Sequence, residues 1–212
     1  MARKPADQSV RREEIIWAAA DVLRRNGYEA TTMKDIAAEV KLTAASLYHH
    51  FPGKDWLLLA VLEAGLEYVI GQIEPIVRSS KSGEQKLREM IAAHVVNLTG
   101  NTAVGAAMVF EIRSLMTIKP PASPAEREAY DDFIARRDAF FERRDDFEEM
   151  FRCVIRQGIE EGAFRPVDVG IFVKMMLGAQ NWVGVWYKAS GRLSGQQIAE
   201  QMADTFLRAL VI

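Results

Sequence analysis

The 212-residue sequence is poor in the residues that most enzymes and secreted proteins depend on. Its single cysteine, Cys153, excludes a disulfide framework and a cysteine-based metal site. Its histidines are His94 and the adjacent pair His49 and His50, which on a helix point about 100° apart and do not share a metal as residues at i and i+4 do. No phosphate loop, glycine fingerprint or nucleophile elbow is present. We therefore expect neither catalysis nor a metal site.

Long apolar runs and an excess of one charge are missing as well. The N-terminus has no apolar signal region and no run appears long enough to span a bilayer, so we expect a cytoplasmic protein with no membrane partner. The 27 basic and 29 acidic residues nearly balance. Residues 1–54 hold nine basic and seven acidic residues, a net charge of +2, which fits nucleic acid at this end only and alone proves nothing.

Residues 32–51 are predicted to form two short helices joined by a tight turn. Thr32 can cap the first helix, with Asp35 as the reciprocal partner of a capping box. Thr43 can cap the second helix, in which Leu47 points inward and Phe51, just beyond it, does the same. The outward residues are small at the N-terminal end and carry hydrogen-bonding groups further along. A helix that enters the DNA major groove needs this, because bulky side chains would hold its axis away from the base edges.

This stretch resembles the DNA-binding domain of TetR-type transcriptional repressors. The motif is specific because the matching positions follow in order without a gap: Thr32, Ile36, Ala37, Leu42, Thr43, Leu47, Tyr48, His50, Phe51 and Lys54. The resemblance covers residues 11–70 and implies a DNA-binding domain over residues 9–54, followed by a ligand-binding and dimerisation domain over residues 55–212. The family usually has glycine where Lys41 stands, so we expect a mildly strained or slightly different turn.

The rest of the chain is helical by period, and no strand pattern appears. We expect an all-α fold of about nine helices, with a three-helix head and a helical body. The first helix is predicted to start at Ser9 or Val10 and to end at Arg25. A single helix is predicted from residue 102 or 103 to 116, and a very long one from Ser123 and Pro124 to Gly162. Ser194 and Gln197 form a second capping box.

The resemblance, carried over position by position, implies two groups of DNA contacts. Phosphate contacts are expected from Thr32, Thr43, Tyr48, His49 and Lys54. Base contacts are expected from Ala44, Ala45 and Ser46, since methyl groups can contact thymine and the serine hydroxyl is an ambiguous hydrogen bonder. His50 and Phe51 are expected to pack inward. Much of the affinity should then come from phosphates and DNA shape.

The last two helices carry more apolar surface than one bundle can hide. The first of these helices is apolar over much of its circumference and includes Trp182 and Trp186. The second carries Phe206 and Leu210. This predicts a homodimer through a four-helix interface, although both helices could also be internal core. A two-fold dimer places its recognition helices in successive major grooves, about 34–36 Å apart, so the operator should be palindromic.

The body is expected to hold a pocket for an apolar small-molecule effector, and no other cofactor. An excess of methionine and aromatic residues over several helices favours such a cavity, although any one of them is more often plain core. The candidate lining residues are Met90, Met108, Phe110, Phe133, Phe140, Arg137, Met175, Trp182 and Trp186.

The class of effector rests on a second resemblance. Residues 180–187 and 191–194 resemble the C-terminal region of TetR members that control fatty-acid or steroid degradation and respond to acyl-CoA thioesters. This implies arginines at the pocket mouth for the CoA phosphates, with Arg113, Arg136, Arg137 and Arg144 as candidates. One alternative is a repressor of an efflux gene that senses a cationic drug or biocide, for which Glu111 is the candidate acid. Another is a protein-interaction module, which would show no salt-dependent binding to duplex DNA.

Overall fold

The computed structural model describes residues 12–121, 123 and 127–212, and these form ten α-helices. The helices are α1 (Arg12–Ala30), α2 (Met33–Glu39), α3 (Ala44–His50), α4 (Lys54–Val77), α5 (Gly83–Gly100), α6 (Thr102–Phe110), α7 (Ile112–Met116), α8 (Arg127–Glu160), α9 (Val169–Trp186) and α10 (Gly195–Leu210). Apart from them, an isolated β-bridge joins Phe164 to Val211. The all-α prediction is confirmed.

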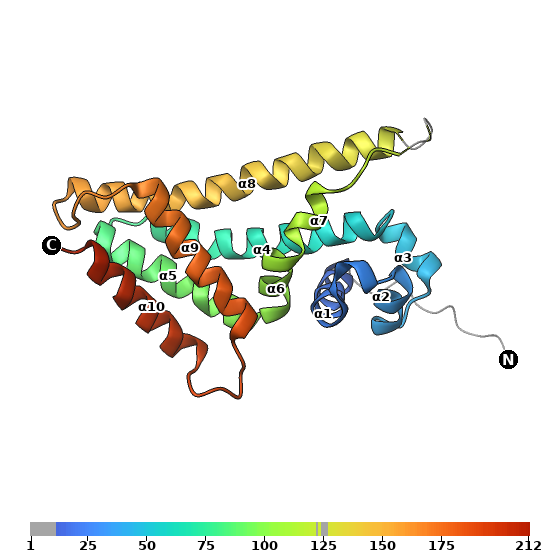
Figure 1. Ribbon diagram of the computed structural model, residues 1–212, viewed down its shortest axis with the longest axis horizontal. Helices are drawn as coiled ribbons and strands as arrows, with labels where there is room; N and C mark the ends of the chain where they lie inside the picture. The colour runs from blue at the N-terminus through green and yellow to red at the C-terminus, as the bar shows by residue number, and fades with distance from the viewer. Residues whose placement is uncertain (1–11, 122, 124–126) are drawn as a thin grey trace.

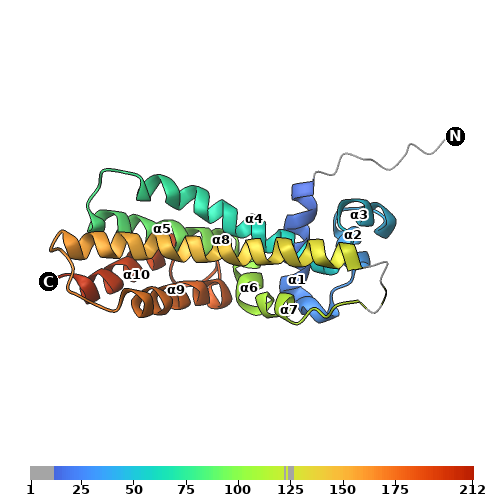
Figure 2. The same ribbon diagram turned by 90° about the horizontal axis from the view of Figure 1, so that it is seen from above.

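Helices α1 to α3 form a head at one end of the molecule, and the long helix α4 runs from this head into the body (Figure 1). In the body, α8 extends along the molecule and packs against α4, α5 and α9 (Figure 2). Helix α10 lies along α5, and α6 packs between α1 of the head and α9 of the body. The head therefore meets the body through two helices, α4 and α6.

One part of the helix prediction is wrong. Residues 102–116 form two helices rather than one, because the chain turns at Glu111, whose φ of −100° lies outside the usual α-helical range. The helix predicted to end at Arg25 breaks at Gly27, where φ is +73° and ψ is 164°, and a second helical stretch continues α1 to Ala30. The predicted helix starts at Ser9 or Val10 and at Pro124 lie outside the described residues.

Helix α4 corrects the expectation about apolar runs. By length and composition alone it could cross a membrane. However, 61% of its most apolar window is buried inside the protein. Its residues from Leu57 to Leu62 are all buried, because this part of the helix passes through the shared core of head and body. Packing inside the protein therefore buries most of this apolar run.

The start of α5 and the end of α8 approach each other backbone to backbone. A Cβ atom added to Gly83 would lie 2.6 Å from the backbone nitrogen of Gly158, which no side-chain movement can relieve. We expect Gly83→Ala to lower the free energy of unfolding by about 2–3 kcal/mol, as overpacked cores do. The thermal midpoint should then fall by roughly 5–10 °C at this chain length.

The matched control for this prediction is Gly71→Ala in α4. Gly71 is exposed and has nothing within 4 Å of an added Cβ, so alanine should stabilise the helix by about 0.5–1 kcal/mol. Thermal unfolding of both variants at one protein concentration provides the measurement. Equal midpoints for Gly83→Ala and the unchanged protein would contradict the close approach.

Candidate DNA-binding surface and effector cavity

The helix-turn-helix is built by side-chain caps. The Thr32 backbone N–H donates to Asp35 Oδ2 at 2.9 Å, and the Asp35 N–H donates to Thr32 Oγ1 at 3.3 Å, so the predicted capping box is confirmed. The Thr32 hydroxyl also donates to Asp35 Oδ2 at 2.7 Å, and this bond, together with that from the Thr32 backbone N–H, lowers the pKa of Asp35. Thr43 caps α3 by accepting from the Ser46 N–H at 3.1 Å. Lys41 in the turn has φ +57°, the left-handed region where a side chain costs roughly 1 kcal/mol, so the expected strain is present.

Helix α3 buries Leu47 and, at its C-cap, Phe51. Ala45, Tyr48 and His49 are exposed, and Ala44 and Ser46 are half-buried. The exposed side thus has the small N-terminal end that a groove-entering helix requires.

His50 corrects an expectation, because its side chain is exposed instead of packed inward. It is the last residue of a short helix, and the extended backbone at Phe51 turns the phenyl ring into the core in its place. The exposed side of α3 therefore includes the His50 imidazole.

Lys54 lies at the start of α4, but its ammonium is turned toward the head. Its Nζ donates to the carbonyl oxygen of Tyr28 at 2.8 Å and lies 4.2 Å from the centre of the Tyr28 ring. The hydroxyl of the same tyrosine donates to Asp55. These contacts tie α4 to the end of α1. If Lys54 also contacts a phosphate as predicted, its ammonium would have to bind the phosphate and hold Tyr28 at the same time.

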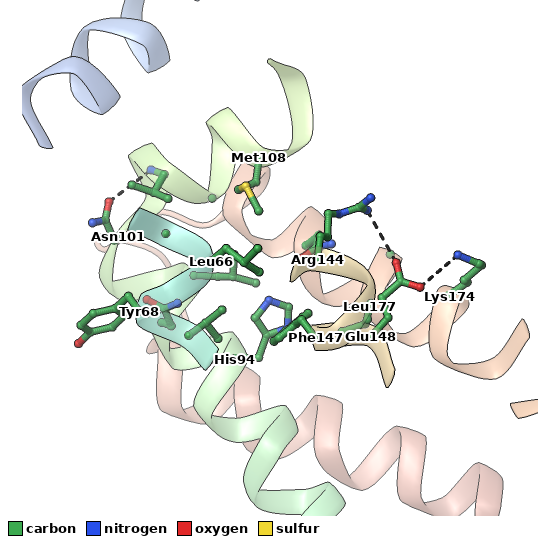
Figure 3. A pocket seen from close by; sticks show the side chains of 18 of the residues that line it. Leu66, Tyr68, His94, Asn101, Met108, Arg144, Phe147, Glu148, Lys174 and Leu177 are labelled. Atoms are coloured by element: carbon green, nitrogen blue, oxygen red, sulfur yellow. Dashed lines mark hydrogen bonds and ion pairs between the residues drawn. The ribbon is translucent and has the colours of Figure 1, made fainter. Parts of the chain in front are cut away.

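The body contains a cavity of about 330 Å³ between α4, α5, α6, α8 and α9, to which α1 adds Trp17. It is lined mainly by apolar side chains, among them Leu66, Val69, Leu98, Val104, Met108, Phe147 and Leu177. Figure 3 shows Tyr68 and Asn101 on one side of this cavity and Arg144, Glu148 and Lys174 on the other. The cavity is therefore mainly apolar and differs in polarity between its two ends.

The structure brings few of the predicted effector residues to this cavity. Met108 lines it, and so does Arg144 among the predicted mouth arginines. Met90, Phe133 and Phe140 are buried in the core. Arg137 is paired with Asp138. The exposed members of the set are Phe110, Met175, Trp182 and Trp186.

The cavity residues that sequence reasoning missed include Trp17, Asn97, Asn101 and Asn181. Polar amides among apolar helix positions were an available signal for Asn97 and Asn181, whereas Asn101 lies between α5 and α6 and caps α6. Glu111, the candidate acid for a cationic drug, does not line this cavity. It lies at the junction of head and body, where burial and Glu29 raise its pKa.

His94 is a buried polar group of the cavity wall, with 4% of its surface exposed. Its Nδ1 lies 3.0 Å from Gln180 Oε1, and its ring packs edge-on against Phe147. Burial lowers the pKa of His94 to about 4, although the Gln180 contact raises it slightly. The imidazole is therefore neutral near pH 7 and offers the cavity a hydrogen-bonding group without charge.

This histidine predicts an acid-sensitive fold. The unfolded chain binds a proton at His94 near pH 6.5 and the folded chain only near pH 4, so stability falls as the pH drops through this interval. From pH 7 to pH 5 the expected loss is about 2 kcal/mol. Denaturant unfolding at these two pH values measures it. His94→Leu should abolish this loss and the exposed-site control His49→Leu should retain it; an unchanged slope in His94→Leu would contradict the assignment.

Helix α9 carries an exposed apolar stripe formed by Ile171, Met175, Trp182 and Trp186, whose exposed fractions are 60%, 66%, 52% and 49%. The spacing places them on one side of the helix, and Phe110 of α6 joins them through an edge contact with Trp182 at 6.3 Å between ring centroids. Helix α10 differs from the prediction, because its apolar side is mostly buried, with Ile198, Ala203 and Leu207 inside. The surface left uncovered thus belongs mainly to α9.

A helix-turn-helix head joined to a helical body that encloses an apolar cavity defines the class of ligand-responsive DNA-binding regulators. Residues 15–61 match the family described as bacterial regulatory proteins, tetR family, and residues 134–210 match the tetracyclin repressor-like C-terminal domain. The chain belongs to the TetR family of transcriptional regulators. It is thus a regulator and not an enzyme.

Several relatives match along nearly the whole chain. The HTH-type transcriptional repressor KstR2 of Mycolicibacterium smegmatis is 28% identical over 93% of this chain and 89% of its own length. The solved structure of the ketosteroid transcriptional regulator KstR2 of Mycobacterium tuberculosis is 26% identical, covers 99% of this chain and 100% of that one, and has a TM-score of 0.80. AibR, solved with isovaleryl coenzyme A and operator DNA, is 24% identical over 94% of this chain and 97% of its own, with a TM-score of 0.73.

Proposed function

We propose that this regulator is a cytoplasmic repressor that binds a palindromic operator as a dimer and leaves it when an apolar acyl effector, such as an acyl-CoA thioester, enters the body. The head would comprise residues 9–54 and the ligand-binding and dimerisation domain residues 55–212. The observation that carries the proposal is the cavity, because Trp17 of the head helix α1 forms part of its wall.

The apolar stripe of α9 supports the dimer. Four large side chains in one row, about half exposed or more, are a surface that monomeric proteins rarely leave in water. A two-fold axis through this stripe would pair α9 with its copy, with α10 at the flank, and would leave both heads directed away from the interface.

The charges of the cavity support an anionic or thioester effector over a cationic drug. Among the described residues that line it, Glu148 is the acidic one, and Arg152 and Lys174 already pair with it. KstR2 of Mycobacterium tuberculosis is described as a ketosteroid transcriptional regulator, and AibR was solved with isovaleryl coenzyme A. At 24% identity AibR supports the shared fold, so the effector class rests on the cavity and on the C-terminal resemblance.

Helices α1 and α4 offer the route from effector to DNA. Leu66 and Val69 of α4 line the same cavity as Trp17, so an effector that displaces any of these side chains acts directly on a helix that carries the head. Such an effector releases DNA only through its higher affinity for the conformation in which the heads are misplaced.

Selection of duplexes from a random DNA pool at fixed near-physiological salt tests this function. The purified full chain should enrich one palindrome, and addition of dodecanoyl-CoA should prevent that enrichment. A palindrome that persists with the thioester would refute the effector and leave the dimeric regulator. Failure to enrich any sequence would refute operator binding and favour a protein-interaction module.

A further inference from the structure

A buried carboxylate with three basic neighbours lies at one end of the cavity. Glu148 is 7% exposed. Its Oε2 lies 2.6 Å from Arg152 Nη2 and 3.1 Å from Lys174 Nζ, and its Oε1 lies 3.9 Å from Arg144 Nη2. One negative charge thus faces three positive charges. A second acid, Glu149, pairs with Arg152 and Arg156. The end of the cavity near Arg144 and Lys174 therefore keeps an excess of positive charge.

Arg144 is the least engaged of these cations. Its contact with Glu148 is longer than a hydrogen bond, whereas the other two cations are within hydrogen-bonding distance of that carboxylate. Two of the other arginines proposed for the mouth are each held by a carboxylate. Arg136 makes two hydrogen bonds to Glu63, and Arg137 bonds to Asp138. Arg144 also lines the cavity, and its planar guanidinium suits a carboxylate or phosphate.

The polarity of the cavity gives a ligand one orientation. Figure 3 shows Arg144, Glu148 and Lys174 together on one side, with Leu66 and His94 between them and Tyr68. Lys174 is exposed and Arg144 half-exposed, so this end reaches solvent. A volume of about 330 Å³ is near the lower end of ligand pockets, which span roughly 300–1,000 Å³. An apolar chain fits within it, with a larger anionic group outside.

We infer that Arg144 and Lys174 bind the anionic head group of an amphiphilic effector whose apolar part lies toward Trp17. Glu148 occupies these cations in the ligand-free protein and competes with the head group. The shared chemistry is an anion on an apolar chain, which either a free carboxylic acid or the phosphates of its coenzyme A thioester supply. This inference rests on the proposed function, since it assumes that the cavity takes an effector.

Calorimetric titration of the full chain with dodecanoate and dodecanoyl-CoA below their micellar concentrations, and with 1-dodecanol below its solubility limit, tests the assignment. We expect at least one anionic probe to bind ten-fold or more tightly than the alcohol. Arg144→Gln should remove that preference and leave the alcohol affinity within two-fold. Dependence on Arg144 for dodecanoate identifies a free acid, and dependence for dodecanoyl-CoA alone identifies the phosphates.

Two further variants separate recognition from folding. Arg156→Gln on the same helix removes an arginine that pairs with Glu149 outside the cavity, and it should change none of the affinities. Glu148→Gln removes the competing carboxylate and should tighten anion binding several-fold with the alcohol unchanged. If Arg144→Gln does not fold, Lys174→Gln on the exposed end takes its place, with the same expected loss of preference.

The possible results distinguish this inference from the proposed function. Equal binding of anions and alcohol, or a preference that survives Arg144→Gln, overturns the head-group site while an effector role remains. Equal loss of all three probes in Arg144→Gln also overturns it, because that points to a damaged cavity. If no probe binds while operator binding is intact, the proposed effector class and the head-group site both fail.

Discussion

Trp182→Glu is expected to convert the dimer into monomers and to weaken binding to the palindromic operator about 100-fold or more. Trp182 lies in the middle of the α9 stripe, next to Phe110 at 6.3 Å between ring centroids. In the proposed interface a carboxylate at this position would be buried without a partner, which costs several kcal/mol. A monomer also loses the gain of about 10²–10⁴ that two linked half-site contacts provide.

Sedimentation velocity and operator titration at the same protein concentrations measure this effect. Val96→Glu is the control, because Val96 is also exposed and apolar but lies on α5, away from the stripe. It should leave both the mass and the affinity unchanged. A Trp182→Glu protein that still sediments as a dimer would contradict the interface, and a monomer with full affinity would contradict the two-site operator.

Caps and helical periodicity predict the secondary structure well because they act over three or four residues. The capping boxes at Thr32 with Asp35 and at Ser194 with Gln197 are present in the structure. The inward positions of Leu47 and Phe51 follow from the same short-range spacing. The helix-turn-helix can therefore be predicted from residues that lie close together in the sequence.

The effector cavity cannot be predicted from short-range spacing, because its shape depends on contacts between helices far apart in the sequence. Phe140 and Phe147 both point inward from α8, but Phe140 belongs to the core and Phe147 lines the cavity. Gly65 and Gly178 contribute to the cavity wall from different helices, but Val104 fills the space beside Gly65, whereas the space beside Gly178 is open. Helical period gives the direction of a side chain but not what lies opposite it.

Charged residues show the same limit. The motif predicts that Lys54 lies near DNA. In the structure its ammonium also donates a hydrogen bond to the carbonyl of Tyr28, a residue 26 positions earlier. Arg144 could not be separated from Arg136 and Arg137 by sequence, since all three lie on one helix. Their partners, Glu148, Glu63 and Asp138, distinguish them.

Ala45→Glu in the recognition helix is expected to lower operator affinity by about 100- to 1,000-fold and to leave folding and dimerisation intact. Ala45 is exposed in α3, so glutamate fits the folded head without a clash. A longer acidic side chain at this point would hold the helix away from the base edges and face the phosphates. Loss of groove docking reduces a specific complex to non-specific binding, and that difference is typically 10³-fold or more.

The matched variant Ala45→Ser keeps the side chain small and should change the affinity less than ten-fold. Titration of the selected palindrome and of an unrelated duplex at one salt concentration separates specific from non-specific binding. Thermal midpoints and sedimentation of both variants should equal those of the unchanged protein, because no buried contact is altered. If Ala45→Glu binds the palindrome as tightly as Ala45→Ser, α3 does not enter the groove by this side. Since Leu47 and Phe51 fill the opposite side, a different element of the head would then have to read the operator.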